Sequence, residues 1–324
     1  PITVSLWNGT ELPYVDNLVN MIVLTEAPGL DQEEFARVLA PSGIIANATQ
    51  REIGITRKPR SATLDEWSHF LHDASNNAVS YDSVVAPSKG LQWTCGPKYA
   101  RSHEHFASMS AMVTAGGRIF YIIDEGPISS VYLPPKWNLV ARDAFSGVLL
   151  WKRPIANWES HLRGFRSGPP EIGRRLVATG DRVYVTMDYG APVKVLDAAT
   201  GDELLTVPET DGARELLLRD GKLFVLADGM TTAQHNERRD LINQEFLATS
   251  PTLNIWQRLS RKAYPIYGAQ RIIAANADSG ELLWKRMFEG SDVILPTAMA
   301  VDNDRICFQT ISRILCLDVN NGNA

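Results

Sequence analysis

Cysteine is scarce in this sequence of 324 residues. Only Cys95, Cys307 and Cys316 are present, and no two of them are spaced as C-x-x-C. This pattern indicates neither a zinc site nor a disulfide framework. Cys307 and Cys316 lie in alternating apolar runs, so we expect both of them to be core residues.

An excess of basic charge and a long apolar run are also missing. The 32 Lys and Arg residues are outnumbered by 37 Asp and Glu residues, which gives a net charge of −5. This balance argues against nucleic acid or an anionic membrane as the main partner. Apolar stretches such as residues 18–24 are far shorter than a membrane span, so we predict none.

The composition is that of an ordinary globular chain, with 44% hydrophobic and 21% charged residues. The sequence begins at Pro1 with neither a charged nor an apolar leader region, and it stops shortly after a turn signal at Gly322. We therefore expect the chain to be a fragment of a longer protein.

The first fifty residues alternate strand and helix signals. Asp31 is a good N-cap for a helix that contains Phe35 and Val38 on one face and that Pro41 ends. Three runs of β-branched and apolar residues predict strands over 2–7, 18–24 and 43–47. Together these elements predict a β-α-β crossover with a parallel sheet.

Segments 8–17 and 37–43 resemble the second half of a class I S-adenosylmethionine (SAM)-dependent methyltransferase. In that family, the loop that matches Asn8, Gly9 and Thr10 lies beside the adenine of SAM. The resemblance implies a partial Rossmann-like α/β domain over residues 1–55. The glycine-rich turn that cradles SAM in the family is missing from the chain, so we expect weak SAM binding or none.

From about residue 107 onward a two-part pattern recurs. The first part is a turn, a basic residue and an apolar strand, and its basic residues are Arg118, Arg182, Lys222 and Arg305. The second part is a turn that begins with Asp or Asn and ends with Gly, followed by an apolar strand that often contains Trp. Its glycines are 147, 201, 280 and 322, which are 54, 79 and 42 residues apart.

Repeats of this length, with several short strands each, are typical of β-propeller blades. The Asp or Asn side chain and the positive φ of Gly suit a tight turn, and we expect the Trp to wedge between neighbouring blades. The longest interval holds an insertion over residues 230–268, in which residues 237–247 are expected to form a surface helix.

The repeat D-A-x-[ST]-G-x-x-L-W-K resembles that of pyrroloquinoline quinone (PQQ) propellers, which occur in quinoprotein alcohol dehydrogenases and in the propeller lipoprotein of the outer-membrane assembly machinery. The resemblance implies a mainly β fold, with about four PQQ-like blades over residues 91–324, the last one incomplete, and a connector over 56–90. Residues 65–73 and 91–93 resemble the linking region of large bacterial proteins in which a methyltransferase-like domain precedes such a propeller.

PQQ-binding members of this family have an adjacent Cys-Cys pair against the quinone and a calcium ion held by Glu, Asn and Asp. No two cysteines are adjacent here. We therefore favour a non-catalytic binding or scaffold module outside the cytoplasm, with a protein or small-molecule ligand at the propeller face or channel. Two alternatives stay open: a quinone-dependent oxidoreductase with PQQ and calcium, and a SAM-dependent methyltransferase whose N-terminal half is missing.

Histidine is concentrated in one part of the sequence. His69, His72, His103 and His105 fall within 37 residues, and neutral imidazole binds zinc, copper, iron or nickel. The H-x-x-H pair would share one face of a helix, and the H-x-H pair one side of a strand. These four residues are a candidate metal site. The alternative that we favour is that they cap and hydrogen-bond around a connecting helix anchored by Trp67.

Two acidic loops complete the candidates. Asp124 and Glu125 follow the end of a predicted strand, and residues 159–166 contain a Glu, a His and two Arg. Such groups could perform acid-base chemistry at a channel mouth. Solvated loops with surface ion pairs are the alternative that we favour.

Overall fold

The structure is a computed structural model that describes residues 2, 4–7, 9–26, 29–49, 52–84, 87, 90–99, 101, 108–129, 133–158, 172–237, 240, 244 and 269–324. The chain divides into two compact units. The first comprises residues 1–65, 81–95 and 143–148, and the second comprises residues 66–80, 96–142 and 149–324.

The first unit contains a small three-stranded sheet with the order β1-β2-β3. Its elements are β1 (Val19–Leu24), α1 (Gln32–Val38), β2 (Leu39–Asn47) and β3 (Gly54–Arg57). Strands β1 and β2 are parallel and α1 lies between them in sequence, as predicted for the crossover. The side chain of Asp31 accepts the Glu33 N–H, and Phe35 and Val38 are buried.

Two predictions for this unit are wrong. The described residues within 2–7 form no strand, and Ile2 and Leu6 are almost fully exposed, because no neighbouring strand pairs with them. The helix ends at Val38 rather than at the proline, and Leu39 already has extended dihedral angles as the first residue of β2. Strand β2 thus begins at Leu39 and runs through Pro41 to Asn47.

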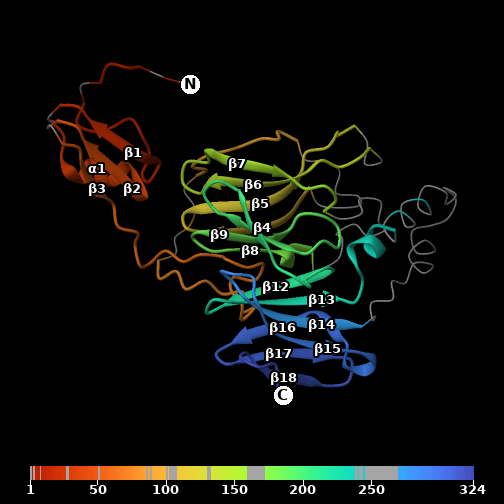
Figure 1. The fold of residues 1–324 in the computed structure, drawn as a ribbon. Helices are drawn as coiled ribbons and strands as arrows, with labels where there is room; N and C mark the ends of the chain where they lie inside the picture. Colours follow the sequence, from red (N-terminus) through yellow and green to blue (C-terminus); the bar gives the residue numbers. More distant parts are fainter. Residues whose placement is uncertain are drawn as a thin grey trace. The chain divides into compact units, whose positions relative to one another are not determined.

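The second unit contains four antiparallel sheets, which we call blades 1 to 4 (Figure 1). Blade 1 consists of β4 (Met109–Ala115), β5 (Arg118–Asp124), β6 (Trp137–Asp143) and β7 (Leu149–Pro154). Blade 2 consists of β8 (Leu176–Ala178), β9 (Arg182–Thr186), β10 (Val193–Asp197) and β11 (Glu203–Thr206).

Blade 3 consists of β12 (Ala213–Arg219), β13 (Lys222–Asp228), β14 (Gln270–Asn276) and β15 (Leu282–Phe288). Blade 4 has three described strands, β16 (Ile294–Asp302), β17 (Arg305–Thr310) and β18 (Ile314–Asp318). Two short 3-10 helices, η1 (Ile172–Arg175) and η2 (Gly290–Asp292), precede β8 and β16. The described chain is therefore mainly β, as predicted, and its antiparallel sheets are consistent with propeller blades.

The turn between the third and fourth strands has the predicted chemistry. In blade 2 the Asp197 carboxylate accepts the N–H groups of Ala199 and Thr200, and Gly201 has a φ of 77°. The other turn glycines, at positions 147, 280 and 322, also have positive φ. A Cβ atom at position 201 would lie 2.7 Å from the Trp151 ring, so this glycine also makes room for the neighbouring blade.

Tryptophan joins neighbouring blades as predicted. The Trp151 indole of blade 1 covers Gly201 of blade 2 and donates a hydrogen bond of 3.0 Å to the Ala198 carbonyl. The Trp284 indole of blade 3 makes the equivalent bond of 3.0 Å to the Val319 carbonyl, beyond β18. Three apolar clusters fill the spaces between blades 1 and 2, 2 and 3, and 3 and 4.

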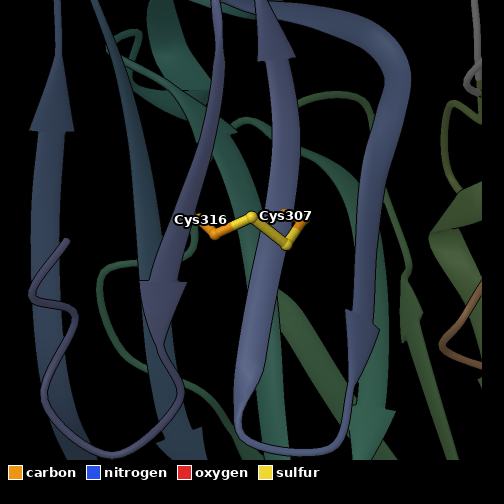
Figure 2. Close-up of a disulfide and its surroundings, with 2 residues drawn as sticks. All are labelled: Cys307 and Cys316. Carbon is orange, nitrogen blue, oxygen red and sulfur yellow. A yellow bond between two sulfur atoms is a disulfide. The ribbon is translucent and has the colours of Figure 1, made fainter.

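The prediction that Cys307 and Cys316 are unpaired core residues is wrong. They lie directly opposite each other on β17 and β18 and form a disulfide (Figure 2). Cys316 is exposed and Cys307 is half-buried, because both side chains point to the face of blade 4 that is turned away from blade 3. The pairing depends on hairpin register, which the cysteine count does not reveal.

The long insertion contains helical residues at 232–237, 240 and 244, so the helix predicted for 237–247 begins earlier than expected. None of the helices in the described part of the chain combines the length and apolar character of a membrane span.

Candidate functional site

One segment of the chain, residues 66–76, crosses the centre of the four blades. The first strands of successive blades contact one another, β4 with β8, β8 with β12 and β12 with β16, so these strands line the centre. Residues 66–76 follow them, and we call this stretch the central segment.

Each blade gives the central segment one backbone N–H. The four donors share one position in the repeat, four residues before its basic residue. The donors are Thr114, Ala178, Leu218 and Val301. In the same order, their acceptors are the Trp67 carbonyl, the Ser68 carbonyl, Nε2 of His69 and the Ala74 carbonyl, at distances from 2.7 to 3.1 Å. The N–H groups that would otherwise face the centre are therefore satisfied by the chain itself.

His69 is the one side chain among these four acceptors. It is 4% exposed, and its Nε2 accepts the Leu218 N–H at 2.9 Å. Its Nδ1 lies 2.7 Å from Ser68 Oγ, so the neutral ring carries its proton on Nδ1 and donates it to Ser68. Burial lowers the pKa of His69 to about 4, which keeps the ring neutral at physiological pH.

His72 closes a tight turn within the central segment. Its carbonyl accepts the His69 N–H at 3.1 Å, and it has a φ of 72°. The imidazole is 3% exposed, meets the Trp67 indole edge-on at 5.2 Å, and has Nδ1 3.5 Å from Asp73 Oδ2. The helix expected here is absent from residues 66–80, because their backbone groups bond to the blades instead of to one another.

A buried ion pair borders the central segment. Arg174 of η1 and Glu215 of β12 are paired, and both are almost inaccessible to solvent. Asn76 donates a hydrogen bond of 3.2 Å to the same carboxylate oxygen of Glu215, and the Phe70 ring lies beneath the Arg174 guanidinium. These contacts join blades 2 and 3 through the central segment.

A second type of polar site recurs at the end of the second strand of a blade. Asp124 pairs with Arg101 at 2.8 Å and also accepts the Gly126 and Lys136 N–H groups. Its neighbour Glu125 pairs with Lys152 at 2.8 Å. The predicted candidates Asp124 and Glu125 thus have structural partners of opposite charge.

Asp228 occupies the equivalent position in blade 3, six residues after the basic residue of the repeat. Its carboxylate lies 2.8 Å from His235 Nε2 and 2.8 Å from Arg214. Burial raises the pKa of Asp228, but the His235 hydrogen bond and the Arg214 charge outweigh it and hold the pKa below its usual value. Sequence reasoning missed this pair, although the repeat position shared with Asp124 is a signal that could have identified it.

Most of the remaining predicted site residues lie outside the part of the chain that the structure describes. Gly9 and Thr10 are exposed in the first unit, and Asn8 lies outside the described residues. His103, His105 and residues 159–166 also lie outside them. Within the ranges that the structure describes, no group of three or more His, Cys, Asp or Glu residues is arranged to hold a metal ion.

The solved structures to which the chain is similar include two alcohol dehydrogenases and a cyclase. A quinohemoprotein alcohol dehydrogenase from Comamonas testosteroni has 14% identity and a TM-score of 0.46, with 81% of this chain and 41% of that chain covered. The quinohemoprotein alcohol dehydrogenase ADHIIG from Pseudomonas putida has 13% identity, a TM-score of 0.45, and coverage of 80% and 39%. Glutaminyl cyclase from Myxococcus xanthus has 11% identity, a TM-score of 0.31, and coverage of 70% and 71%.

The chain spans about two fifths of the length of the two dehydrogenases. No curated protein matches the sequence. The methyltransferase resemblance of residues 1–55 finds no support in these comparisons, and one short helix does not make a Rossmann-like domain. The model of the family described as outer membrane protein assembly factor BamB matches residues 135–324, more than half of the chain, so the chain belongs to this family.

Proposed function

We propose that this chain is a non-catalytic, protein-binding scaffold that acts outside the cytoplasm. The observation that carries the proposal is the occupied centre of the blades. The central segment uses one N–H of every blade, and His69 and the Arg174–Glu215 pair fill the space beside it. Propellers that bind cofactors need this region for the ligand.

The described residues do not fit PQQ with calcium. The resemblance implies two adjacent cysteines, whereas the disulfide of this chain links residues on separate strands of blade 4. A calcium site needs converging oxygen ligands, and the part of the chain covered by the structure contains no cluster of three carboxylates, imidazoles or thiols. A quinone-dependent oxidoreductase is therefore the less favoured alternative.

The outer strands provide a surface for a protein partner. Strands β7, β11 and β15 are the edges of their sheets, so an extended partner segment can pair with them. Each also presents exposed leucines just after the turn, namely Leu149, Leu150, Leu204, Leu282 and Leu283. A repeated apolar edge of this kind favours a partner with an extended, apolar segment.

The Cys307–Cys316 disulfide supports a location outside the cytoplasm. Disulfides persist in oxidising compartments and are rare in the cytosol, where thiols are kept reduced. Cys316 is exposed, so nothing in blade 4 shields this bond from cellular reductants.

Two measurements test the proposal. After incubation with PQQ and Ca²⁺ followed by desalting, the purified chain is expected to retain no chromophore, and stoichiometric retention would overturn the scaffold proposal in favour of a quinone enzyme.

A photo-crosslinking residue at position 283 is expected to capture a defined protein in the native cell, and one at the exposed neighbour Glu281 is the matched control. Equal capture at both positions, or at neither, contradicts the leucine surface.

A further inference from the structure

The connection between the second and third strands of blade 3 is much longer than its equivalents in the neighbouring blades. It spans residues 229–269, whereas the same connection spans residues 187–192 in blade 2 and 311–313 in blade 4. Residues 230–237 begin the long connection, and we call them the strap. The contacts that hold the strap decide where the long connection leaves the blades.

Two side chains of the strap are turned toward the blades. His235 is 6% exposed and Thr232 is half-buried. Gln234 and Glu237, on the same stretch, are exposed. Residues 232–237 are helical, and positions three apart in a helix lie on the same face. Thr232 and His235 therefore lie together on the face of the strap that contacts the blades.

Two glycines form the floor of the recess that holds the His235 ring. Gly190, in the loop between β9 and β10, has a φ of 67°, and a Cβ atom there would lie 2.3 Å from Cγ of His235. Gly212, directly before β12, has a φ of 72°, and a Cβ atom there would lie 3.0 Å from Nε2 of His235. The imidazole thus occupies space that a side chain at either position would fill.

The walls of the recess recognise both the polarity and the shape of the ring. The Asp228 carboxylate at the end of β13 lies 2.8 Å from Nε2 of His235. An ionised carboxylate only accepts hydrogen bonds, so Nε2 carries the proton and donates it. Tyr189 meets the imidazole edge-on, with the ring centroids 5.5 Å apart. Because Tyr189 belongs to blade 2 and Asp228 to blade 3, the ring joins the two blades.

Thr232 reaches the same two blades one helical turn earlier. Its hydroxyl lies 3.0 Å from the Gly190 carbonyl of blade 2 and 2.7 Å from the Asp211 carboxylate beside blade 3. The Gly212 N–H donates to the same Gly190 carbonyl at 2.9 Å. The strap, blade 2 and blade 3 therefore meet at this carbonyl.

Blade 1 uses the equivalent aspartate in a related way. Asp124 accepts the N–H two residues further along the chain, as Asp228 does. Its partner from outside the strands of the blade is Arg101, at 2.8 Å, and His235 takes this place in blade 3. The aspartate at this repeat position thus anchors segments that lie outside the regular strands.

We propose that the strap is a clasp that closes over blades 2 and 3, and that the His235 imidazole is its key. With the ring in the recess, the start of the long connection is fixed beside the loop between β9 and β10. With the ring withdrawn, the strap opens while both blades stay folded, because their strands keep their own ladders and shared apolar cluster. The recess is accordingly a binding site for one imidazole ring, which the chain fills with its own histidine.

Hydrogen exchange of the His235→Ala variant, with and without free imidazole, tests the clasp. The strap amide at position 235, which donates to the Thr231 carbonyl, is expected to exchange at least about tenfold faster than in the wild type, and so is the Gly212 amide. The amides of β13 should keep their protection. Imidazole at millimolar concentration should fill the recess and restore slow exchange at both positions.

Two further variants separate the key from a general loss of stability. Glu237→Ala, at an exposed residue of the same helix, should leave all of these exchange rates unchanged. His235→Phe keeps a ring but loses the N–H donor, so the strap should open and imidazole should not restore it. Wild-type exchange in His235→Ala and His235→Phe, no response of His235→Ala to imidazole, or an equal rise across the amides of β13 would overturn the proposal.

Discussion

Protonation of His69 should weaken the centre of the blades. Its Nε2 accepts the Leu218 N–H and carries no proton, and burial holds the pKa of His69 at about 4, below its usual value of 6.5. A proton on Nε2 would replace this hydrogen bond with two facing donors and place a charge in a buried site. The nearby Asp73 raises the pKa of His69 and the nearby His72 lowers it, but both effects are smaller than that of burial.

The direction of the pH effect on stability follows from the protonation of His69 in the native and in the unfolded chain. Above pH 6.5 the ring is neutral in both states, so its contribution to stability is complete. As the pH falls below 6.5, the His69 ring becomes protonated in the unfolded chain but stays neutral in the native chain. Its stabilising contribution therefore decreases and is lost by about pH 4. One pKa unit corresponds to about 1.4 kcal/mol, so the full loss is about 3 kcal/mol, of which about 2 kcal/mol is lost by pH 5.

Urea denaturation of the wild type and the His69→Gln variant, at pH 8 and at pH 5, measures this term. The glutamine carbonyl can still accept the Leu218 N–H but does not titrate in this range. The free energy of unfolding should therefore fall by about 2 kcal/mol more in the wild type than in the variant between these pH values. Equal falls in the two proteins would refute the assignment of His69 as a buried neutral acceptor.

Three further predictions concern stability. Trp151→Ala removes a buried indole and should lower the free energy of unfolding by about 3 to 5 kcal/mol in urea denaturation, whereas a loss below about 1 kcal/mol would contradict its role between blades. Removal of the disulfide by Cys307→Ala with Cys316→Ala should cost about 2 to 3 kcal/mol, read as a lower thermal midpoint, since the bond closes a loop with a separation of 9 residues. Asp228→Asn should lower the free energy of unfolding by about 1 to 3 kcal/mol at pH 7, and by less at pH 3, in chemical denaturation. The pKa of Asp228 is lowered in the folded chain, so its stabilising contribution is complete above pH 4 and is lost as the pH falls through that pKa. An equal cost at both pH values would contradict the role of the ionised carboxylate.

The blades could be predicted from sequence because their signals are local. A turn such as 197–201 fixes its own geometry through an Asp side chain and a glycine with positive φ. Continuous apolar runs in β9 and β13 indicate strands that are buried on both faces. The β1-α1-β2 crossover followed from a capping residue and a helical period for the same reason. Each of these patterns lies within about 30 residues of chain.

The central segment could not be predicted because its partners are distant in sequence. Trp67, Phe70 and Leu71 favour a helix by spacing alone, yet the groups of this segment bond to strands that lie between 47 and 227 residues away. His69 was singled out as a metal candidate, and the decisive fact is the Leu218 N–H that meets its Nε2. The disulfide was missed for a related reason, because Cys307 and Cys316 become neighbours only through the register of β17 and β18.

The central claim is that the chain itself fills the centre of its blades. Hydrogen exchange at the amides of Thr114, Ala178, Leu218 and Val301, followed with and without PQQ and Ca²⁺, tests it most directly. If the central segment is a permanent part of the fold, all four amides should exchange only at the rate of global unfolding, and the ligands should change none of them. Exchange within minutes at these four positions, or new protection when PQQ and Ca²⁺ are added, would show that the central segment can be displaced from the blades and would contradict the account.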